Sequence, residues 1–261
     1  MTIFKHELRQ GKNALLIWTA AICFMLGICI LIYPEMSSQM GEMSAMFADM
    51  GSFSQAFGMD RINFGEFIGF FGVECGNILG LGGAFFAALL GISSLAKEEK
   101  DHTAEFLLTH PISRARIMEE KLLAVIAQIV ILNTAAIGVT TLSILAIGEE
   151  VPLKTLSLLF LAYFLMQLEV ACITFGISAF LRHGSLGIGL GLAAVFYFLN
   201  IIANLTKEAK FLKYITPFGY TEGSDIIADE CINTGYLAVG IAFSIAGILL
   251  AFWIYQKKDI S

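Results

Sequence analysis

The sequence predicts an all-α integral membrane protein that crosses the bilayer six times and forms one domain over residues 1–261. Hydrophobic residues make up 57% of the chain and charged residues only 15%, whereas an ordinary soluble domain has about 45–50% and about 25%. The apolar residues gather in six stretches, each with roughly the 20 residues that a helix needs to cross the hydrocarbon core. The stretches do not alternate apolar with polar residues, which argues against a β-barrel.

The predicted spans are residues 14–33, 67–95, 120–147, 155–181, 185–203 and 235–255. An even number of spans places both termini on one side of the membrane. Lys and Arg concentrate on the cytoplasmic side of membrane proteins, and most of the 16 basic residues fall on the side of the termini: Lys5, Arg9, Lys12, Lys97, Lys100, Arg114, Arg116, Lys121, Arg182, Lys257 and Lys258. Both termini are therefore predicted to be cytoplasmic, although Lys207, Lys210 and Lys213 fall on the outer side.

The first 12 residues mix apolar Ile3, Phe4 and Leu8 with charged neighbours. This pattern is typical of a short helix that lies on the membrane surface. We therefore expect an N-terminal amphipathic elbow helix over residues 1–12, with an unstructured charged tail as the alternative. The span that follows is too long for the apolar core of a signal peptide, and no cleavage site of the A-x-A type follows it. It is predicted to be retained.

Two outer loops are predicted, over residues 34–66 and 204–234. The first carries a series that would share one face of a helix: Met36, Met40, Met43, Phe47, Met50, Ser54 and Phe57. Because Met-x-x-Met spacing also occurs, a Cu(I) site is one alternative, but methionine also fills adaptable apolar surfaces. We expect an interfacial or re-entrant helix in this loop and no metal site.

The second predicted span carries a small residue at every fourth position. Small side chains at that spacing let two helix backbones approach closely, which is how helices associate in lipid. The stripe predicts a helix-packing face, either within the chain or against a second subunit, made of Gly72, Gly76, Gly80, Ala84 and Ala88.

Two acidic residues fall inside predicted spans. Glu169 lies near the middle of the fourth span, where an ionised side chain costs about 2.5–3.5 kcal/mol, so it must face protein or water or be protonated. Glu169 is therefore a candidate for a translocation path, and so is Glu74, nearer the outer end of the second span. The alternative for Glu169 is a neutral carboxyl that bonds to a neighbouring helix through Asn133 or Asn200.

Several classes of function are disfavoured by what the sequence lacks. It has no GxxxxGK[ST] phosphate loop, no HExxH and no GxSxG, so the chain is not expected to be an enzyme that hydrolyses ATP or peptides by those routes. A net charge of −6 argues against a nucleic-acid partner. The 5 cysteines lack CxxC spacing and predict neither a disulfide framework nor a zinc site.

The connection between the second and third spans, residues 97–118, is the most informative segment. Asp101 can cap a short helix that ends before Pro111, because the residue before a proline avoids the helical region. Ser113 can cap the helix that follows. The short helix would present an apolar cluster among charged residues, which is typical of a docking surface for a soluble partner. The cluster consists of Phe106, Leu107 and Leu108.

This segment resembles the signature of the permease subunits of type-two ABC exporters, E-x-x-x-G-T-x-E-x-L-L-x-x-P-x-x-R followed by a lysine. The matching residues are Glu98, Thr103, Glu105, Leu107, Leu108, Pro111, Arg114 and Lys121. His102 replaces the usual glycine, so the turn into the helix can differ. Residues 257–260 are similar to the family's closing basic-Asp-Ile motif, and residues 216–218 to its Ser-Pro-Phe element.

The resemblance implies that residues 98–110 form a coupling helix seated in a groove of a separate cytoplasmic ABC ATPase subunit. It implies that ATP and Mg²⁺ bind to that partner, that this chain holds no cofactor, and that a second permease completes an export path in the plasma membrane, as a homodimer or a heterodimer. Two alternatives stay open. One is an ion-driven secondary carrier that uses Glu169, although no internal repeat with broken helices is found; the other is a non-transporting membrane anchor or sensor.

Overall fold

A computed structural model describes residues 2–49, 51–56, 63, 65–97, 112–181 and 186–257, with the side chains of 38–49, 52 and 53 outside that description. The first helix, α1, covers Thr2–Asp49 and is followed by the short α2, Ser52–Ala56. The second span consists of α3 (Phe67–Cys75), the π-helical turn η1 (Gly76–Leu81) and α4 (Gly82–Ser93). Next come α7 (Arg114–Ala146), α8 (Leu153–Ser178) and α9 (Leu186–Leu205). The last elements are the 3₁₀ helices η2 (Glu208–Tyr214) and η3 (Pro217–Tyr220), then α10 (Gly223–Asp229) and α11 (Thr234–Lys257).

Among the described residues, six helical stretches are long and apolar enough to cross a membrane: Thr2–Ser37, Phe67–Ser93, Arg114–Ala146, Leu153–Ser178, Leu186–Leu205 and Thr234–Lys257. Each of them overlaps one of the six predicted spans. The predicted all-helical class is confirmed, and the six candidate spans agree with the predicted number of crossings. No strand occurs in the described part of the chain. The protein is therefore a multi-pass helical membrane protein.

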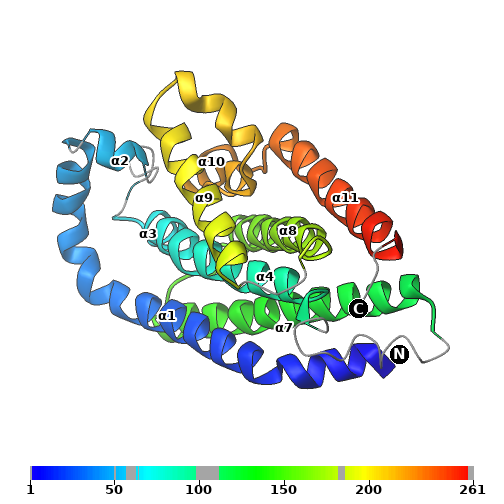
Figure 1. The fold of residues 1–261 in the computed structure, drawn as a ribbon. Helices are drawn as coiled ribbons and strands as arrows, with labels where there is room; N and C mark the ends of the chain where they lie inside the picture. The colour runs from blue at the N-terminus through cyan, green and yellow to red at the C-terminus, as the bar shows by residue number, and fades with distance from the viewer. Residues whose placement is uncertain are drawn as a thin grey trace.

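The second and fourth spans form the centre of the bundle (Figure 1). In each of these two spans, 61% of the most apolar 18-residue stretch is buried. The corresponding share is 28% in α1 and in α9, and 11% in α11. Helix α4 packs on α8, α1 runs beside α7, and α11 lies against another side of α8. The core between these helices is built from large apolar side chains, among them Phe71, Leu79, Ile129 and Tyr163. The peripheral helices expose apolar side chains, as surfaces that contact lipid or another membrane subunit do.

The start of α1 and the end of α11 lie at the same end of the bundle, which we call the terminal end (Figure 1). Residues 2–12 are helical but continue into the first span without a break, so a separate elbow helix is not confirmed. Helix α1 also extends beyond its predicted end and takes in the first part of the predicted outer loop. Pro34 lies inside it and removes one backbone hydrogen bond. The location of this extension at the membrane interface stays a prediction, as does the metal alternative, whose methionines beyond Met36 lie outside the described side chains.

The second predicted outer loop, residues 204–234, is folded against the bundle rather than extended outside it. Between α9 and α11 the chain forms η2, η3 and α10, and all four residues of η3 are buried. Thr216 begins η3: its hydroxyl accepts the N–H of Phe218 at 3.3 Å and donates to the carbonyl of Phe196 at 2.7 Å. The segment resembling the Ser-Pro-Phe element is thus a buried turn that brings η3 against α8, α9 and α11.

Helices α8 and α11 approach closely at a pair of glycines. A Cβ atom added to Gly176 would lie 2.7 Å from the carbonyl oxygen of Gly247, and one added to Gly247 would lie 2.7 Å from the carbonyl oxygen of Cys172. Both contacts are with backbone atoms, which cannot swing aside as a flexible side chain could. The packing of the last span on the centre of the bundle therefore requires glycine at these two positions.

We expect Gly247→Ala to destabilise the protein by about 1–3 kcal/mol, because the added methyl group must push α11 away from α8. The measurement is unfolding of the purified protein in detergent, followed by circular dichroism. The matched control is Gly138→Ala, in α7, where a Cβ atom meets nothing within 4 Å. The control should be neutral or slightly stabilising, since alanine favours helix more than glycine does. Equal stability of the two variants would contradict the close approach.

Candidate functional site

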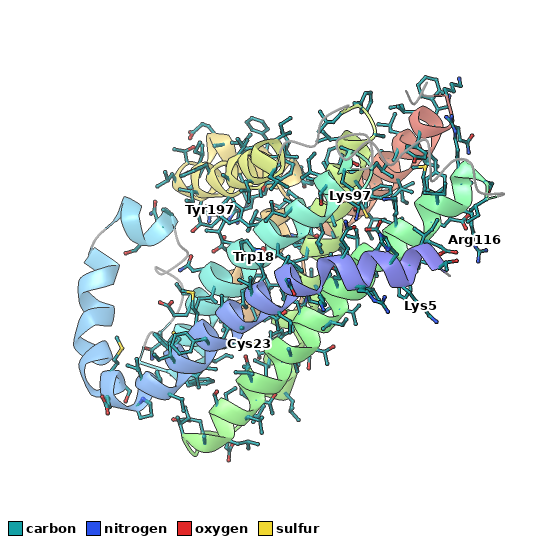
Figure 2. The ribbon with its side chains drawn as sticks, turned by 60° about the horizontal axis from the view of Figure 1, so that its bottom comes forward. Lys5, Trp18, Cys23, Lys97, Arg116 and Tyr197 are labelled. Carbon is teal, nitrogen blue, oxygen red and sulfur yellow. The ribbon has the colours of Figure 1, made fainter. Side chains whose placement is uncertain are left out.

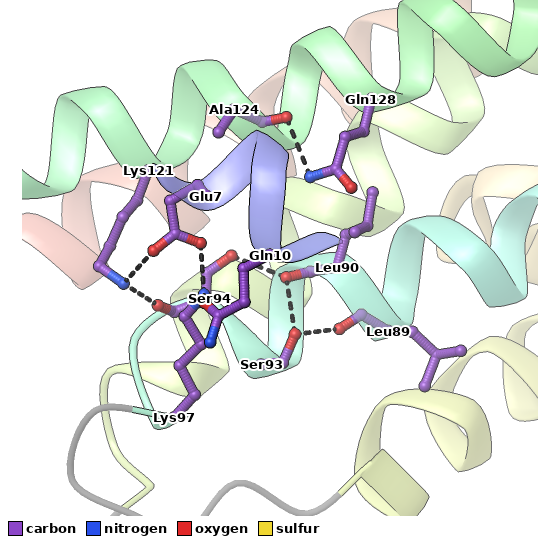
Figure 3. Close-up of polar contacts among 10 residues, drawn as sticks. All are labelled: Glu7, Gln10, Leu89, Leu90, Ser93, Ser94, Lys97, Lys121, Ala124 and Gln128. Atoms are coloured by element: carbon purple, nitrogen blue, oxygen red, sulfur yellow. Dashed lines mark hydrogen bonds and ion pairs between the residues drawn. The ribbon is translucent and has the colours of Figure 1, made fainter. Parts of the chain in front are cut away.

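A polar cluster with a buried centre joins three helices at the terminal end (Figure 3). This terminal polar cluster consists of Glu7, Gln10, Ser94, Lys97 and Lys121. The Lys121 ammonium group donates to Glu7 Oε1 at 3.1 Å and to the Ser94 carbonyl at 2.7 Å. Lys97 donates to Glu7 Oε2 at 2.5 Å and to Gln10 Oε1 at 2.7 Å. The cluster therefore ties the start of α1 to the end of α4 and the start of α7.

The burial of Lys121 makes this cluster energetically important. Its side chain is only 1% exposed and that of Glu7 is 11% exposed. A buried ammonium group that loses its carboxylate partner has no water to replace it, so removing one member of such a pair is strongly destabilising. The lysine that ends the family-like signature is thus an internal anchor between helices.

Glu120 adds a second connection between α1 and α7. Its Oε2 atom accepts the backbone N–H groups of Ile3 and Phe4, at 3.1 and 3.2 Å. These amides belong to the first turn of α1, where backbone donors lack helical partners and negative charge is favourable. Glu120 Oε1 accepts from Arg116 Nε at 3.0 Å. The carboxylate therefore holds the N-terminus of α1 against the first turns of α7.

Arg114 connects the start of α7 to the end of α11. Its guanidinium group donates to the carbonyl oxygens of Tyr255 and Gln256, at 3.1 and 3.3 Å. The last carbonyls of a helix lack helical partners and favour a nearby cation. The hydroxyl of Ser113 accepts the N–H of Arg116 at 3.3 Å, which confirms the predicted cap of α7.

Most residues of the predicted coupling segment lie outside the described residues: Glu98, Thr103, Glu105, Phe106, Leu107, Leu108 and Pro111. The described residues on either side are Lys97 and Ile112. Figure 2 shows Lys97 at the same end of the bundle as Lys5 and Arg116. Of the signature, Arg114 and Lys121 are described, and both bond to other helices of this chain. The segment therefore begins just after α4, at Lys97, which bonds to α1, and it ends in the first turns of α7, where Arg114 bonds to α11.

The sequence alone does not single out Glu7 or Glu120 as members of this arrangement. The four-residue spacing of Arg116 and Glu120 is a readable ion-pair signal on a helix. No local signal points from Glu7 to Lys121, 114 residues away. That pairing is decided by the packing of α1 on α7.

Glu169 is buried between α8, η3 and α11, and only 3% of it is exposed. The Tyr220 hydroxyl donates to Glu169 Oε2 at 2.8 Å. On the α11 side, a Cβ atom on Gly240 would lie 2.2 Å from the same oxygen, so the carboxyl group occupies the space that this glycine leaves open. The prediction that Asn133 or Asn200 bonds to Glu169 is wrong. Asn133 donates instead to Gln167 Oε1 at 2.6 Å, and Asn200 donates to Glu222.

Glu74 does not share a site with Glu169. It is half-buried on α3 and lies near Cys29 of α1, whereas Glu169 faces η3 and α11. The structure therefore does not bring the two carboxylates of the predicted translocation path together.

The predicted packing stripe lies against helices of the same chain. A Cβ atom on Gly76 would lie 3.1 Å from the Tyr163 hydroxyl in α8, and one on Gly80 would lie 3.2 Å from the Tyr163 ring. One on Gly72 would lie 2.4 Å from the side chain of Ile227 in α10. Ala84 and Ala88 are fully buried. The stripe passes through the π-helical turn η1, a feature that the sequence did not predict and that often marks functional regions of helices.

We expect Lys121→Met to destabilise the protein by about 3–5 kcal/mol, because it leaves Glu7 in the cluster without its most buried partner. Hydrogen exchange should show faster exchange of the first turns of α1 and the last turn of α4, and detergent unfolding should occur earlier. The control is Lys5→Met, which changes an exposed lysine of α1 at the same end of the bundle and should alter stability by less than about 0.5 kcal/mol. Similar behaviour of the two variants would argue against the cluster as an anchor.

Replacement of Tyr220 by Phe keeps the ring but removes the donor to Glu169. We expect a loss of about 1–3 kcal/mol, because a buried carboxyl group then lacks its hydrogen bond. Glu169→Gln should stay closer to wild type, since the amide oxygen still accepts from the Tyr220 hydroxyl. Thermal unfolding of both variants in detergent checks this order of stability, and the reverse order would disprove it.

Comparison with known proteins agrees with this architecture. The family model described as "ABC-2 family transporter protein" matches residues 1–260. The chain is also 24% identical over 201 residues to a protein of Bacillus subtilis (strain 168) named "Uncharacterized protein YhcI"; the match covers 67% of this chain and 64% of that protein, slightly less than two thirds of its length. The six apolar helices and a family match over almost the whole sequence lead to one conclusion: the chain belongs to the ABC-2 family of transporter proteins.

Proposed function

We propose that the chain is the permease subunit of an ABC exporter and is driven by a separate cytoplasmic ATPase subunit. Membership of the ABC-2 family supports the role in membrane transport. The main support for coupling to an ATPase comes from residues 97–118, the segment with the coupling signature. Both ends of this segment are bonded to other helices of the chain. In this proposal ATP and Mg²⁺ bind in the partner, and this chain supplies the membrane path and the surface on which the ATPase acts.

The bonds made by Lys121 and Arg114 suggest how a movement of the coupling segment would be transmitted to the membrane-spanning helices. A displacement of the coupling segment acts first on the end of α4 and the start of α7. Because Lys121 bonds to Glu7, and Arg114 bonds to the last carbonyls of α11, the ends of α1 and α11 follow. Packed helices shift as units rather than deform continuously. Closure of two ATPase subunits would then move the terminal ends of four helices together in each of two permeases.

The orientation and surroundings follow from the same proposal. The terminal end faces the cytoplasm of the plasma membrane, in line with the basic residues gathered there. A second permease, identical or related, covers part of the exposed apolar surface of the peripheral helices. Export rather than import is inferred from the coupling signature in residues 98–121.

A second candidate function rests on one observation, the buried carboxyl group of Glu169 inside the bundle. An intramembrane ionisable residue is a functional-site hypothesis by default. An ion-driven secondary carrier would use it as a proton or sodium site and would need no ATPase. In the exporter, the same residue would line the translocation path between α8, η3 and α11.

The coupling proposal is tested by co-expressing the chain with the ATPase encoded beside it and replacing both Glu105 and Leu107 with Ala. We expect at least about a tenfold loss of co-purified ATPase and of the ATPase rate of the complex in nanodiscs, because the docking helix loses an apolar contact and a charge. The matched control is Glu149→Ala with Leu142→Ala, both exposed and distant from the terminal end.

Two results would count against the proposal. One is assembly and ATPase activity that are unchanged in the Glu105 and Leu107 variant. The other is transport by the purified chain alone that is lost in Glu169→Gln, which would favour the secondary carrier.

A further inference from the structure

A small cavity of about 50 Å³, with both polar and apolar lining, lies between α3, η1, α8, α9 and α10, away from the terminal polar cluster. Two of the side chains that line it, Tyr163 and Asn200, are 1% and 8% exposed. The Tyr163 hydroxyl and the Asn200 Oδ1 atom have no hydrogen-bond partner in the described part of the chain. Buried polar groups are normally satisfied, so a cavity bounded by two such atoms indicates a ligand or ordered water.

The carboxylate of Glu222 sets the chemistry of this cavity. Its Oε2 atom accepts from Asn200 Nδ2 at 3.1 Å and from Asn204 Nδ2 at 2.8 Å. An ionised carboxylate only accepts hydrogen bonds, so the amide of Asn200 must turn its nitrogen toward Glu222 and its oxygen elsewhere. The cavity therefore offers a carboxylate, an amide oxygen and a phenol. A primary ammonium group, with a positive charge and three donors, complements this set.

A larger cleft of about 390 Å³ adjoins the cavity, and Glu222 and Ser224 line both. The cleft is also lined by the three lysines that depart from the charge distribution expected of an outer segment: Lys207, Lys210 and Lys213. Lys213 is buried and donates to Asp225 at 3.2 Å. Lys207 and Lys210 are exposed and form no ion pair with a described residue. The cleft thus offers two available positive charges beside a carboxylate-lined cavity.

We propose that the cavity and the cleft together bind a small zwitterion. Its ammonium group lies against Glu222, the Asn200 oxygen and the Tyr163 hydroxyl, and its anionic group lies between Lys207 and Lys210. The head group of phosphatidylethanolamine and small soluble phosphate or carboxylate zwitterions share this chemistry. The site lies at the end of the bundle opposite the termini, which faces outward under the proposed orientation. Binding itself needs neither ATP nor the ATPase, so failure of the coupling proposal leaves it intact.

The test measures binding of phosphoethanolamine to the purified full chain in phosphatidylglycerol nanodiscs by calorimetry, with ethanolamine and inorganic phosphate as partial probes. We expect phosphoethanolamine to bind more tightly than either partial probe. Glu222→Gln, which keeps an acceptor for both asparagines, should weaken binding about tenfold or more. The control Glu230→Gln alters an exposed carboxylate that pairs with Lys154 outside the cleft and should change the affinity less than about twofold.

The lysine end of the site has its own variants. Lys207→Gln with Lys210→Gln should weaken phosphoethanolamine binding about tenfold and leave ethanolamine binding nearly unchanged, whereas Lys154→Gln should affect neither. Repeating the titration in phosphatidylethanolamine nanodiscs separates the two sources of the ligand. Weaker binding there identifies the lipid head group as the occupant, and unchanged binding identifies a soluble zwitterion.

Three results would overturn the proposal. The first is the absence of phosphoethanolamine binding in phosphatidylglycerol nanodiscs, which would leave the cavity to water. The second is phosphate binding as tight as that of phosphoethanolamine, which would indicate a simple basic surface. The third is unchanged binding in Glu222→Gln when the unfolding temperature of that variant shows that it is folded.

Discussion

The ammonium group of Lys121 is buried away from water, and it donates hydrogen bonds to the carboxylate of Glu7 and the carbonyl of Ser94. Desolvation of a charge is so unfavourable that the two residues can be buried only together and only with good geometry. This requirement fixes the start of α1 relative to α4 and α7. Glu120 of α7 adds a second such contact, because its carboxylate accepts hydrogen bonds from the first backbone amides of α1. The arrangement of the terminal end, including the two ends of the coupling segment, depends on these paired charges.

The same rule governs the polar groups deeper in the bundle. Glu169 accepts from Tyr220, and the amides of Asn133 and Gln167 bond to each other. Each pair joins two separate elements, α8 to η3 and α7 to α8, because in an apolar surrounding a polar group must find its partner within the protein. Some buried polar atoms lack a partner in the described part of the chain, and two of them, the Tyr163 hydroxyl and the Asn200 Oδ1 atom, border one cavity. Their shared position at that cavity is the reason to seek a ligand there.

Small residues determine how closely the helices that carry these groups can approach. Glycines at 176 and 247 bring the backbones of α8 and α11 together, and Gly240 leaves space for the carboxyl group of Glu169. Gly223 of α10 approaches the backbone of Gly72 in α3 in the same way. Helix association in lipid relies on such contacts rather than on the hydrophobic effect.

The sequence by itself determined the six spans, the shared side of the termini, the cap at Ser113 and the signature in residues 98–121. These features follow from local composition and spacing, because apolar length, basic flanks and capping residues act over one helix or one turn. The tertiary structure decided which groups meet: Glu7 with Lys121, Tyr220 with Glu169, and Glu222 with Asn200. It also folded one part of a predicted outer loop, η3, into a buried turn and joined the elbow segment to the first span. Such pairings depend on helix packing between residues distant in the sequence, and the pattern of one chain does not contain that information.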